Sequence, residues 1–391
     1  LNWCPSDYND PKLDIEATGA DDYYNNYFYN GWAHYGLSNG TAMAKSLLYN
    51  TDGYMRCSLT AESLKQGIIE NLFSTQGNGM YQKGQSFELL NALSNVQMHG
   101  YVGVLNSCDI YLEDIIKWFF EVYIKNEFGA NGFICNMPEK SDSILSKYER
   151  VATVMDGETK QFKLFCEEGE IDRELYEMIS GSVRYKEIPS LIKNKYAYAN
   201  SNEIVREMHD MFSDQCMLSY TEKTGSKYNT FFELLRLENV KPEEIEEYNF
   251  DELNWLLERG VVYVSDGMLA LNYERIWILK ELNDKGVICL QYKDSDILRK
   301  LISEGEIRVE SSLLSESEWE YFNYVLNKSE FSNGLDLRNR YIHDTNSLDK
   351  RHQQNDYIVL LKMFVILVIK INEEFCLQDK ISKKGVDFYE L

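Results

Sequence analysis

The stretch GLDLRNRYIHDT, residues 334–345, gathers side chains that could act on a phosphate group. Arg338, Asn339, Arg340 and His343 fall within six positions of a strongly acidic chain. Histidine titrates near neutral pH, so it can move protons to or from a 2′-hydroxyl or a leaving oxygen. Arginine can hold a phosphate through paired N–H groups and stabilise developing charge, and asparagine can orient either partner. These residue types suit RNA cleavage without a metal ion.

Helical geometry separates these residues into two directions. Asp336 is a predicted N-cap for a helix from residue 337 to about residue 343. At ~3.6 residues per turn, Asn339 and Arg340 share a side with His343. Arg338 lies five positions before the histidine, about 140° around the axis, so we expect it to point elsewhere.

A helix is predicted before this stretch, over residues 313–328. Ser315 and Glu318 have the spacing of a capping box, in which each side chain bonds the other residue's backbone N–H. The apolar positions that follow recur at helical spacing.

A second helix is predicted after the stretch, from about residue 355 to 375. Its apolar run is interrupted by Lys362 and Lys370 and falls short of the roughly 20 residues that a membrane span needs. These lysines and Glu373 make only a thin polar stripe. We therefore expect no membrane contact and a helix covered by its own domain, by a second chain, or by both.

The order Arg-Asn-x-x-x-His between these two helices resembles the HEPN superfamily of small helical domains, over roughly residues 311–380. Many members are metal-independent endoribonucleases of toxin, antiviral and CRISPR-associated systems. The resemblance implies catalytic roles for Arg338, Asn339 and His343, products with a 2′,3′-cyclic phosphate, no cofactor, and a homodimer that pairs two motifs. Asp344 departs from relatives of the abortive-infection subtype, which often have glycine after the histidine.

The neighbouring cations are the predicted substrate-binding residues. Arg340, Lys350 and Arg351 form a local cluster of positive charge, which an RNA-binding groove would need in this acidic chain. The alternative is a non-catalytic HEPN-like interaction or dimerisation protein that binds a protein or nucleic-acid partner. Under that alternative, Arg338 and Arg340 pair with Asp336, Asp344 or Asp349 in a solvated network of little energetic weight.

Charge and cysteine content limit which partners, metal sites and cellular location are expected. The net charge of −23 argues against a surface devoted to coating nucleic acid and allows a protein partner at the acidic N-terminal regions. The eight cysteines form no CxxC pair, so we expect neither a zinc site nor a disulfide framework, and we expect a cytoplasmic location. No apolar signal segment follows Leu1, and we expect the native start to be trimmed or upstream.

We expect a mainly α protein of several subdomains. The predicted segments are a mostly helical domain over 1–150, a helical middle region over 151–250, a winged-helix-like module over 251–310 and the HEPN-like domain over 311–391. Within the third segment, three helices each end at a glycine that a short strand follows. The dipeptide Asp266-Gly267 predicts a type I′ hairpin turn. Acidic residues offset the cations of this module, which disfavours DNA binding.

The first half of the chain offers fewer predictions. Residues 1–50 are rich in aromatic and turn-forming residues, and we expect irregular structure. Helices are predicted over 60–73 and 109–129, the second capped by Asp109, with residues 136–150 as a connection.

Overall fold

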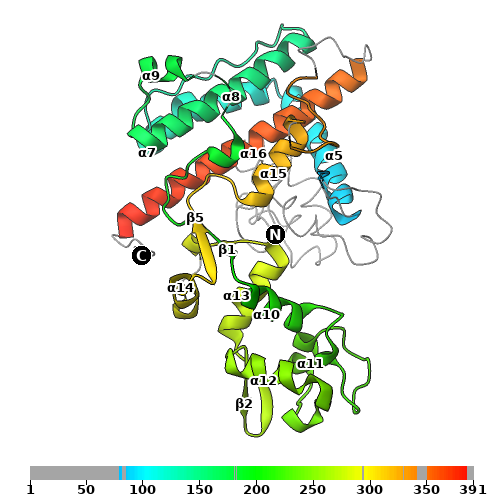
Figure 1. Cartoon of the computed structure of the whole chain (residues 1–391). Helices are drawn as coiled ribbons and strands as arrows, with labels where there is room; N and C mark the ends of the chain where they lie inside the picture. Colours follow the sequence, from blue (N-terminus) through cyan, green and yellow to red (C-terminus); the bar gives the residue numbers. More distant parts are fainter. Residues whose placement is uncertain are drawn as a thin grey trace, which may run out of the picture. The chain divides into compact units, whose positions relative to one another are not determined.

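The computed structural model describes residues 79–81, 85–179, 181, 183–292, 295–328, 330–340 and 350–384. The described chain is mainly helical, as predicted, and carries two small antiparallel sheets. It forms two compact units; in Figure 1 the first carries the labels α5, α7, α8, α9, α15 and α16, and the second carries α10 to α14 with the labelled strands. The helical unit comprises the described residues up to Ile192 and from Ser312 onward, and the sheet unit comprises Lys193–Ser311. The winged-helix and HEPN-like assignments stay predictions.

The helical unit contains nine helical segments within its described residues. They are α5 (Gln85–Ser107), α6 (Leu112–Trp118), the π-helical turn η3 (Phe119–Tyr123), α7 (Ile124–Phe128), α8 (Ile144–Glu168), α9 (Arg173–Met178), the 3₁₀ turn η4 (Tyr185–Glu187), α15 (Glu316–Leu326) and α16 (Lys350–Lys384).

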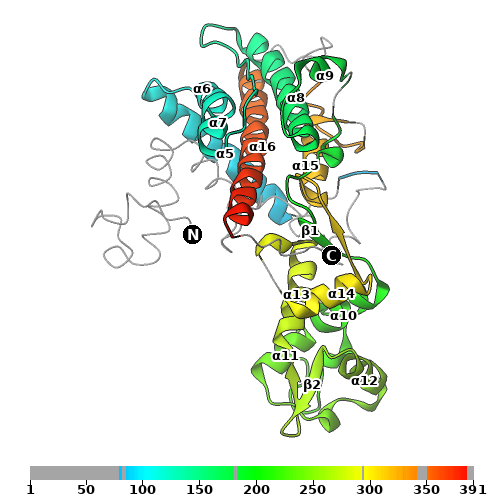
Figure 2. The same cartoon turned by 90° about the vertical axis from the view of Figure 1, so that its left-hand side faces the viewer.

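Helix α16 is the central element of this unit. It packs against α8 on one side and against α5 and α7 on the other (Figure 2). Its apolar side chains from Tyr357 to Phe375 are buried in the shared core. The predicted buried helix is confirmed, with its cover supplied by its own chain. Among the described helices, none is long and apolar enough to cross a bilayer.

The expected polar stripe of α16 lies inside the unit. Lys362 is 1% exposed and donates to Asn91 Oδ1 at 3.0 Å and to Asn95 Oδ1 at 2.7 Å, both on α5. Lys370 is buried too, and its ammonium lies 3.1 Å from the carboxylate of Glu318 on α15. Buried ammonium groups need such partners because desolvation is costly. The two lysines therefore tie α16 to two neighbouring helices.

The capping box that starts α15 is confirmed. Ser315 N–H donates to Glu318 Oε2 at 2.8 Å, and the Ser315 side chain accepts in return. The helix then runs to Leu326, two residues short of the predicted end. Because both capping groups are buried, this start of α15 is firmly specified.

The helix predicted over 109–129 is present, with corrections at its start and middle. Asp109 has a φ of +58° and is not its cap; α6 begins at Leu112 after Tyr111. The five residues of η3 widen the helix into a π turn before Gly129 ends α7 at a φ of +72°. The carboxylate of Glu113 in α6 accepts from the Tyr357 hydroxyl of α16 at 2.6 Å.

The predicted connection over 136–150 is too long. Helix α8 already begins at Ile144, with the Ser143 side chain accepting from Ser146 N–H as its N-cap. The expectations for residues 1–50 and 60–73 lie outside the described residues.

The sheet unit joins short helices to five strands within its described residues. They are β1 (Tyr196–Ala199), α10 (Asn202–Phe212), η5 (Met217–Ser219), α11 (Phe231–Leu237), η6 (Pro242–Glu244), η7 (Glu247–Asn249), α12 (Phe250–Glu258), β2 (Val262–Ser265), β3 (Met268–Leu271), α13 (Tyr273–Lys285), β4 (Ile288–Cys289), η8 (Leu290–Tyr292), α14 (Asp296–Ser303) and β5 (Ile307–Glu310). Strand β1 lies between β4 and β5, antiparallel to both.

The glycine-ended repeat is confirmed in the sheet unit. Gly260, Gly286 and Gly305 follow α12, α13 and α14 with φ angles of +69°, +68° and +74°. A strand begins two residues after each glycine. Glycine is favoured here because a left-handed residue lets the chain leave the helix without a Cβ clash.

The predicted hairpin is also confirmed. Strands β2 and β3 pair with Ser265 opposite Met268, so Asp266 and Gly267 form a two-residue loop. Their φ angles of +51° and +75° are those that a type I′ turn requires.

Candidate functional site

The turn that carries the arginines is built on the end of α15. The last carbonyl groups of that helix would otherwise lack partners. Backbone N–H groups from the following loop supply them, at 2.8, 3.1 and 3.1 Å, in the pairs Leu335 to Tyr324, Leu337 to Val325 and Arg338 to Leu326. The side chain of Leu337 is fully buried beneath the turn. The arginine turn, residues 335–340, is thus a cap of α15.

Gly334 admits this close approach. A Cβ atom there would lie 2.7 Å from the Asn327 carbonyl oxygen and 3.0 Å from that of Phe331. Both contacts are with backbone atoms that cannot rotate away. The first residue of the GLDLRNRYIHDT stretch therefore needs to be glycine for steric reasons.

The loop before the turn is fixed by a short segment from elsewhere in the sequence. The Asn333 side chain accepts from Tyr81 N–H at 2.8 Å and donates to the Tyr81 carbonyl at 3.0 Å. The Tyr81 ring stacks on Tyr324 of α15, with centroids 4.4 Å apart. Tyr81, near the start of the described chain, thereby holds the loop that leads into the turn.

Asp336 does not serve as the predicted N-cap. Its φ is +52°, in the left-handed region, whereas an N-cap residue has extended backbone. Its carbonyl accepts from the N–H groups of Asn339 and Arg340, at 3.2 and 3.0 Å, and its carboxylate accepts from Asn339 Nδ2 at 2.9 Å. Residues 337–340 form a turn, while His343 and Asp344 lie outside the described residues.

Arg338 binds a carboxylate on α8. Its guanidinium forms an ion pair with Asp156, and both side chains are mostly buried, at 23% and 17% exposed. Burial raises the pKa of Asp156, and the charge of Arg338 partly offsets that rise. About two helical turns earlier on α8, the Tyr148 hydroxyl donates to the Leu337 carbonyl. Helix α8 therefore holds both the side chain and the backbone of the turn.

Arg340 points to a different helix. Its Nη1 lies 2.8 Å from Asp356 Oδ2 near the start of α16, and its Nη2 donates to the Leu335 carbonyl at 3.0 Å. The Arg340 side chain is 39% exposed, more than that of Arg338. The two arginines of the turn thus point to different helices.

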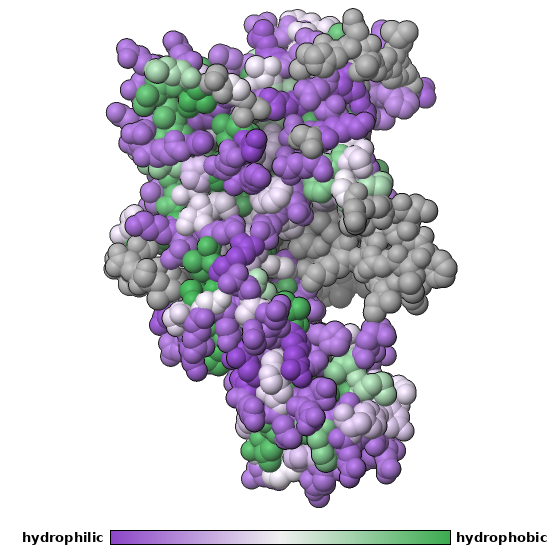
Figure 3. All heavy atoms as spheres, viewed as in Figure 1, coloured by the Kyte–Doolittle hydropathy of each residue, from purple (hydrophilic) through white to green (hydrophobic). Residues whose placement is uncertain are grey.

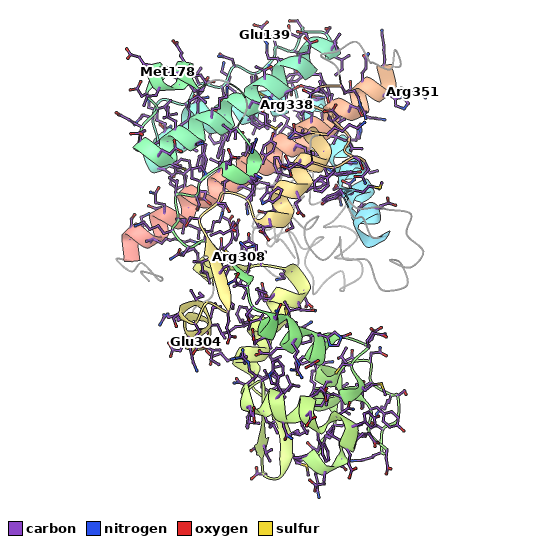
Figure 4. The ribbon with its side chains drawn as sticks, viewed as in Figure 1. Glu139, Met178, Glu304, Arg308, Arg338 and Arg351 are labelled. Atoms are coloured by element: carbon purple, nitrogen blue, oxygen red, sulfur yellow. The ribbon has the colours of Figure 1, made fainter. Side chains whose placement is uncertain are left out.

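Lys350 and Arg351 are exposed at the start of α16. In Figure 4, Arg351 lies at that end of the helix, whereas Arg338 lies between α8 and α16. The described site has four cations, Arg338, Arg340, Lys350 and Arg351, and three carboxylates, Asp156, Asp336 and Asp356, a balance of +1. The positive charge is therefore largely matched by acids.

Sequence reasoning missed both acidic partners. Asp356 lies near the start of the helix predicted after the motif, but it is 16 residues from Arg340, and no spacing rule connects the two. Asp156 and Tyr148 lie on α8, far away in sequence, and no local pattern connects them to the turn. Among the described residues, no group of three or more His, Cys, Asp and Glu side chains is placed to hold a metal ion.

Comparisons with protein-family models, with curated proteins and with solved structures each found no match for this chain.

Proposed function

We propose that this chain is a metal-independent endoribonuclease of the HEPN kind, in a bacterial defence or toxin-type system. The 2′-hydroxyl of RNA would attack the adjacent phosphate and form a 2′,3′-cyclic phosphate, while the bond to the 5′-oxygen of the next nucleotide breaks and that oxygen leaves, protonated, as a 5′-hydroxyl. His343 would move the proton, Asn339 would orient the reacting groups, and the arginine turn with Lys350 and Arg351 would bind the phosphates. A homodimer would bring two such turns together.

The observation that carries this proposal is the fixed orientation of two guanidinium groups on one turn. Each arginine is held by a carboxylate from a different helix, and the turn itself is hydrogen-bonded to the end of α15. Preorganised donors stabilise developing charge without rearranging during the reaction. A pre-set turn directly before the histidine is what the proposed chemistry needs.

Incubation of the purified chain with a mixed RNA in EDTA tests the proposal. We expect cleavage that His343→Ala abolishes, with cyclic phosphate ends on the products. Arg150→Ala, which changes an exposed arginine on α8, is the matched control and should cleave as the wild type does. Absence of cleavage across varied RNAs, or equal cleavage by His343→Ala, contradicts the proposal. Light scattering at micromolar concentration tests the homodimer.

A second candidate function is a non-catalytic interaction module. It is favoured by the ion pairs of both arginines and by exposed apolar side chains on α9, where Leu175 is 41% and Met178 is 77% exposed. Figure 3 shows a hydrophobic patch over this part of an otherwise largely hydrophilic face. Such patches often mark protein contacts. Loss of self-association or of a partner in a Leu175→Ser, Met178→Ser variant, with no RNA cleavage by the wild type, would favour this function.

A further inference from the structure

The two arginines of the turn sit in different environments, although they are only two residues apart. Arg338 is 23% exposed and faces Asp156, which is 17% exposed, so this ion pair is mostly removed from water. The buried Tyr185 hydroxyl senses the charges of both side chains, and among the described groups none forms a hydrogen bond with it. A buried ion pair is costly to break, because separation leaves an uncompensated charge in the interior.

Arg340 is the more accessible arginine. Its side chain is 39% exposed while it contacts Asp356 and the Leu335 carbonyl. A guanidinium carries a fixed charge and several N–H donors, so an exposed one can attract a phosphate and exchange an existing partner for it. A phosphate can therefore approach Arg340 from solvent without first dismantling the core of the turn.

We propose that Arg338 is a positioning residue, anchored by Asp156, and that Arg340 is the arginine that contacts the RNA phosphate. This inference rests on the proposed ribonuclease function and assigns roles within its site. It changes the role of Arg338, for which the resemblance implies catalysis, and it gives the predicted substrate-binding residue Arg340 the phosphate contact. The ion pair with Asp156 holds the turn against α8, and the turn presents Asn339 and Arg340.

A charge exchange separates a positioning role from a phosphate contact. Arg338→Asp and Asp156→Arg, each made alone, place two like charges together, so each should lower RNA cleavage at least tenfold and lower the thermal midpoint. The double variant restores opposite charges in reversed order. We expect it to recover cleavage to within about threefold of the wild type, since a paired interaction couples the two sites. A folded double variant that stays inactive overturns the inference, because an aspartate at position 338 cannot bind phosphate.

Asp156→Asn gives an independent answer if the exchanged pair does not fold. This near-isosteric change removes the charge that anchors Arg338. An anchored positioning role predicts at least tenfold slower cleavage, with the loss rescued by Asp156→Glu. If Arg338 itself contacts phosphate, releasing it from Asp156 leaves cleavage unchanged or faster, and that result overturns the inference.

Arg340→Ala tests whether Arg340 contacts the RNA phosphate. We expect weaker RNA binding by about tenfold, a smaller dependence of binding on salt concentration, and a thermal midpoint within about 2 °C of the wild type. Unchanged RNA affinity overturns the assignment of Arg340. If the wild-type chain neither cleaves nor binds RNA, the proposed function and the Arg340 role both fall. The thermal midpoints of the Arg338 and Asp156 variants still decide the anchoring role, because that measurement does not need activity.

Discussion

Two regions of the molecule each bring together two arginines and two acidic residues, and they are built in opposite ways. In the sheet unit, Glu207 of α10 is fully buried and accepts from both Arg259 and Arg275, at 2.6 to 2.9 Å. Glu306, just before β5, closes the network by accepting from Arg259 Nη1 at 2.8 Å. In the arginine turn of the helical unit, each arginine has its own aspartate on a different helix.

The difference teaches what a charged cluster can be used for. In the sheet unit, the four charged side chains form one shared network that joins α10, the end of α12, α13 and the start of β5. Little of Glu207 or Arg275 is left in contact with water. The Arg259 bond holds the pKa of Glu306 below its ordinary value. The turn keeps its two ion pairs separate, and one of its arginines remains over a third exposed. We read the network as scaffolding and the turn as a surface that can meet a ligand.

The largest expected effect comes from opening the network. Glu207→Ala leaves Arg259 and Arg275 partly buried without their shared carboxylate, and breaking such a buried cluster costs about 3–5 kcal/mol. Urea or thermal unfolding followed by circular dichroism measures the loss.

The matched control for this variant is Glu304→Ala, which removes an exposed ion pair with Lys300 in the same unit. Its effect should stay below about 0.5 kcal/mol. A Glu207→Ala protein as stable as the wild type would contradict the closed-network description.

The next effect tests the support of the turn. Gly334→Ala places a Cβ against two backbone carbonyl oxygens, so the loop must shift, at a cost of about 1–3 kcal/mol. Gly103→Ala on α5 is the control, since a Cβ there meets nothing within 4 Å and alanine favours helix. Thermal unfolding should show loss for the first variant and no loss for the second; equal midpoints would show that the turn tolerates displacement.

A third prediction extends the comparison to three neighbouring carboxylates on and near α15. On α15, burial and the charges of Glu316 and Glu330 raise the pKa of Glu320 to about 7. The folded state then binds a proton more tightly than the unfolded state, so stability falls as pH rises from about 4.5 to about 7.

Glu320→Gln should remove this fall in stability between about pH 4.5 and pH 7. At pH 8 the variant should be more stable than the wild type, by no more than about 1 kcal/mol after allowance for the partial exposure of Glu320. Thermal midpoints between pH 4.5 and pH 8 measure the difference. Glu168→Gln, at the exposed end of α8, should leave the fall in stability as it is. If Glu320→Gln loses stability with rising pH as the wild type does, the pH dependence belongs to another titratable group.

The smallest expected effect on stability lies inside the turn. Asn339→Ala removes one partly exposed hydrogen bond, from Nδ2 to Asp336, and should cost about 0.5–1 kcal/mol. Under the proposed function, RNA cleavage should fall by more than this loss of stability explains. A cleavage rate that matches the wild type would limit Asn339 to a structural role.

The sequence determined the parts of the fold that depend on neighbours a few residues apart. The Ser315 and Glu318 capping box, the glycine ends of three helices and the Asp266-Gly267 hairpin all follow from backbone groups that bond within a turn. Periodicity likewise identified α16 as a buried helix. Local hydrogen bonds and steric limits act before any tertiary contact forms, so residue types and spacing suffice to predict them.

Only the tertiary structure decided where the charged side chains go. Helix packing brings Asp156 to Arg338, Asp356 to Arg340 and the polar face of α5 to Lys362, none of which spacing predicts. Asp336 takes left-handed backbone where capping was expected, because the residues on both sides of it bond the end of α15. Asp109 is also left-handed, but for a local reason: it follows α5, and the next N–H, of Ile110, bonds the Leu105 carbonyl. An ion pair depends on distance and burial, which residues far apart in sequence acquire only when helices pack.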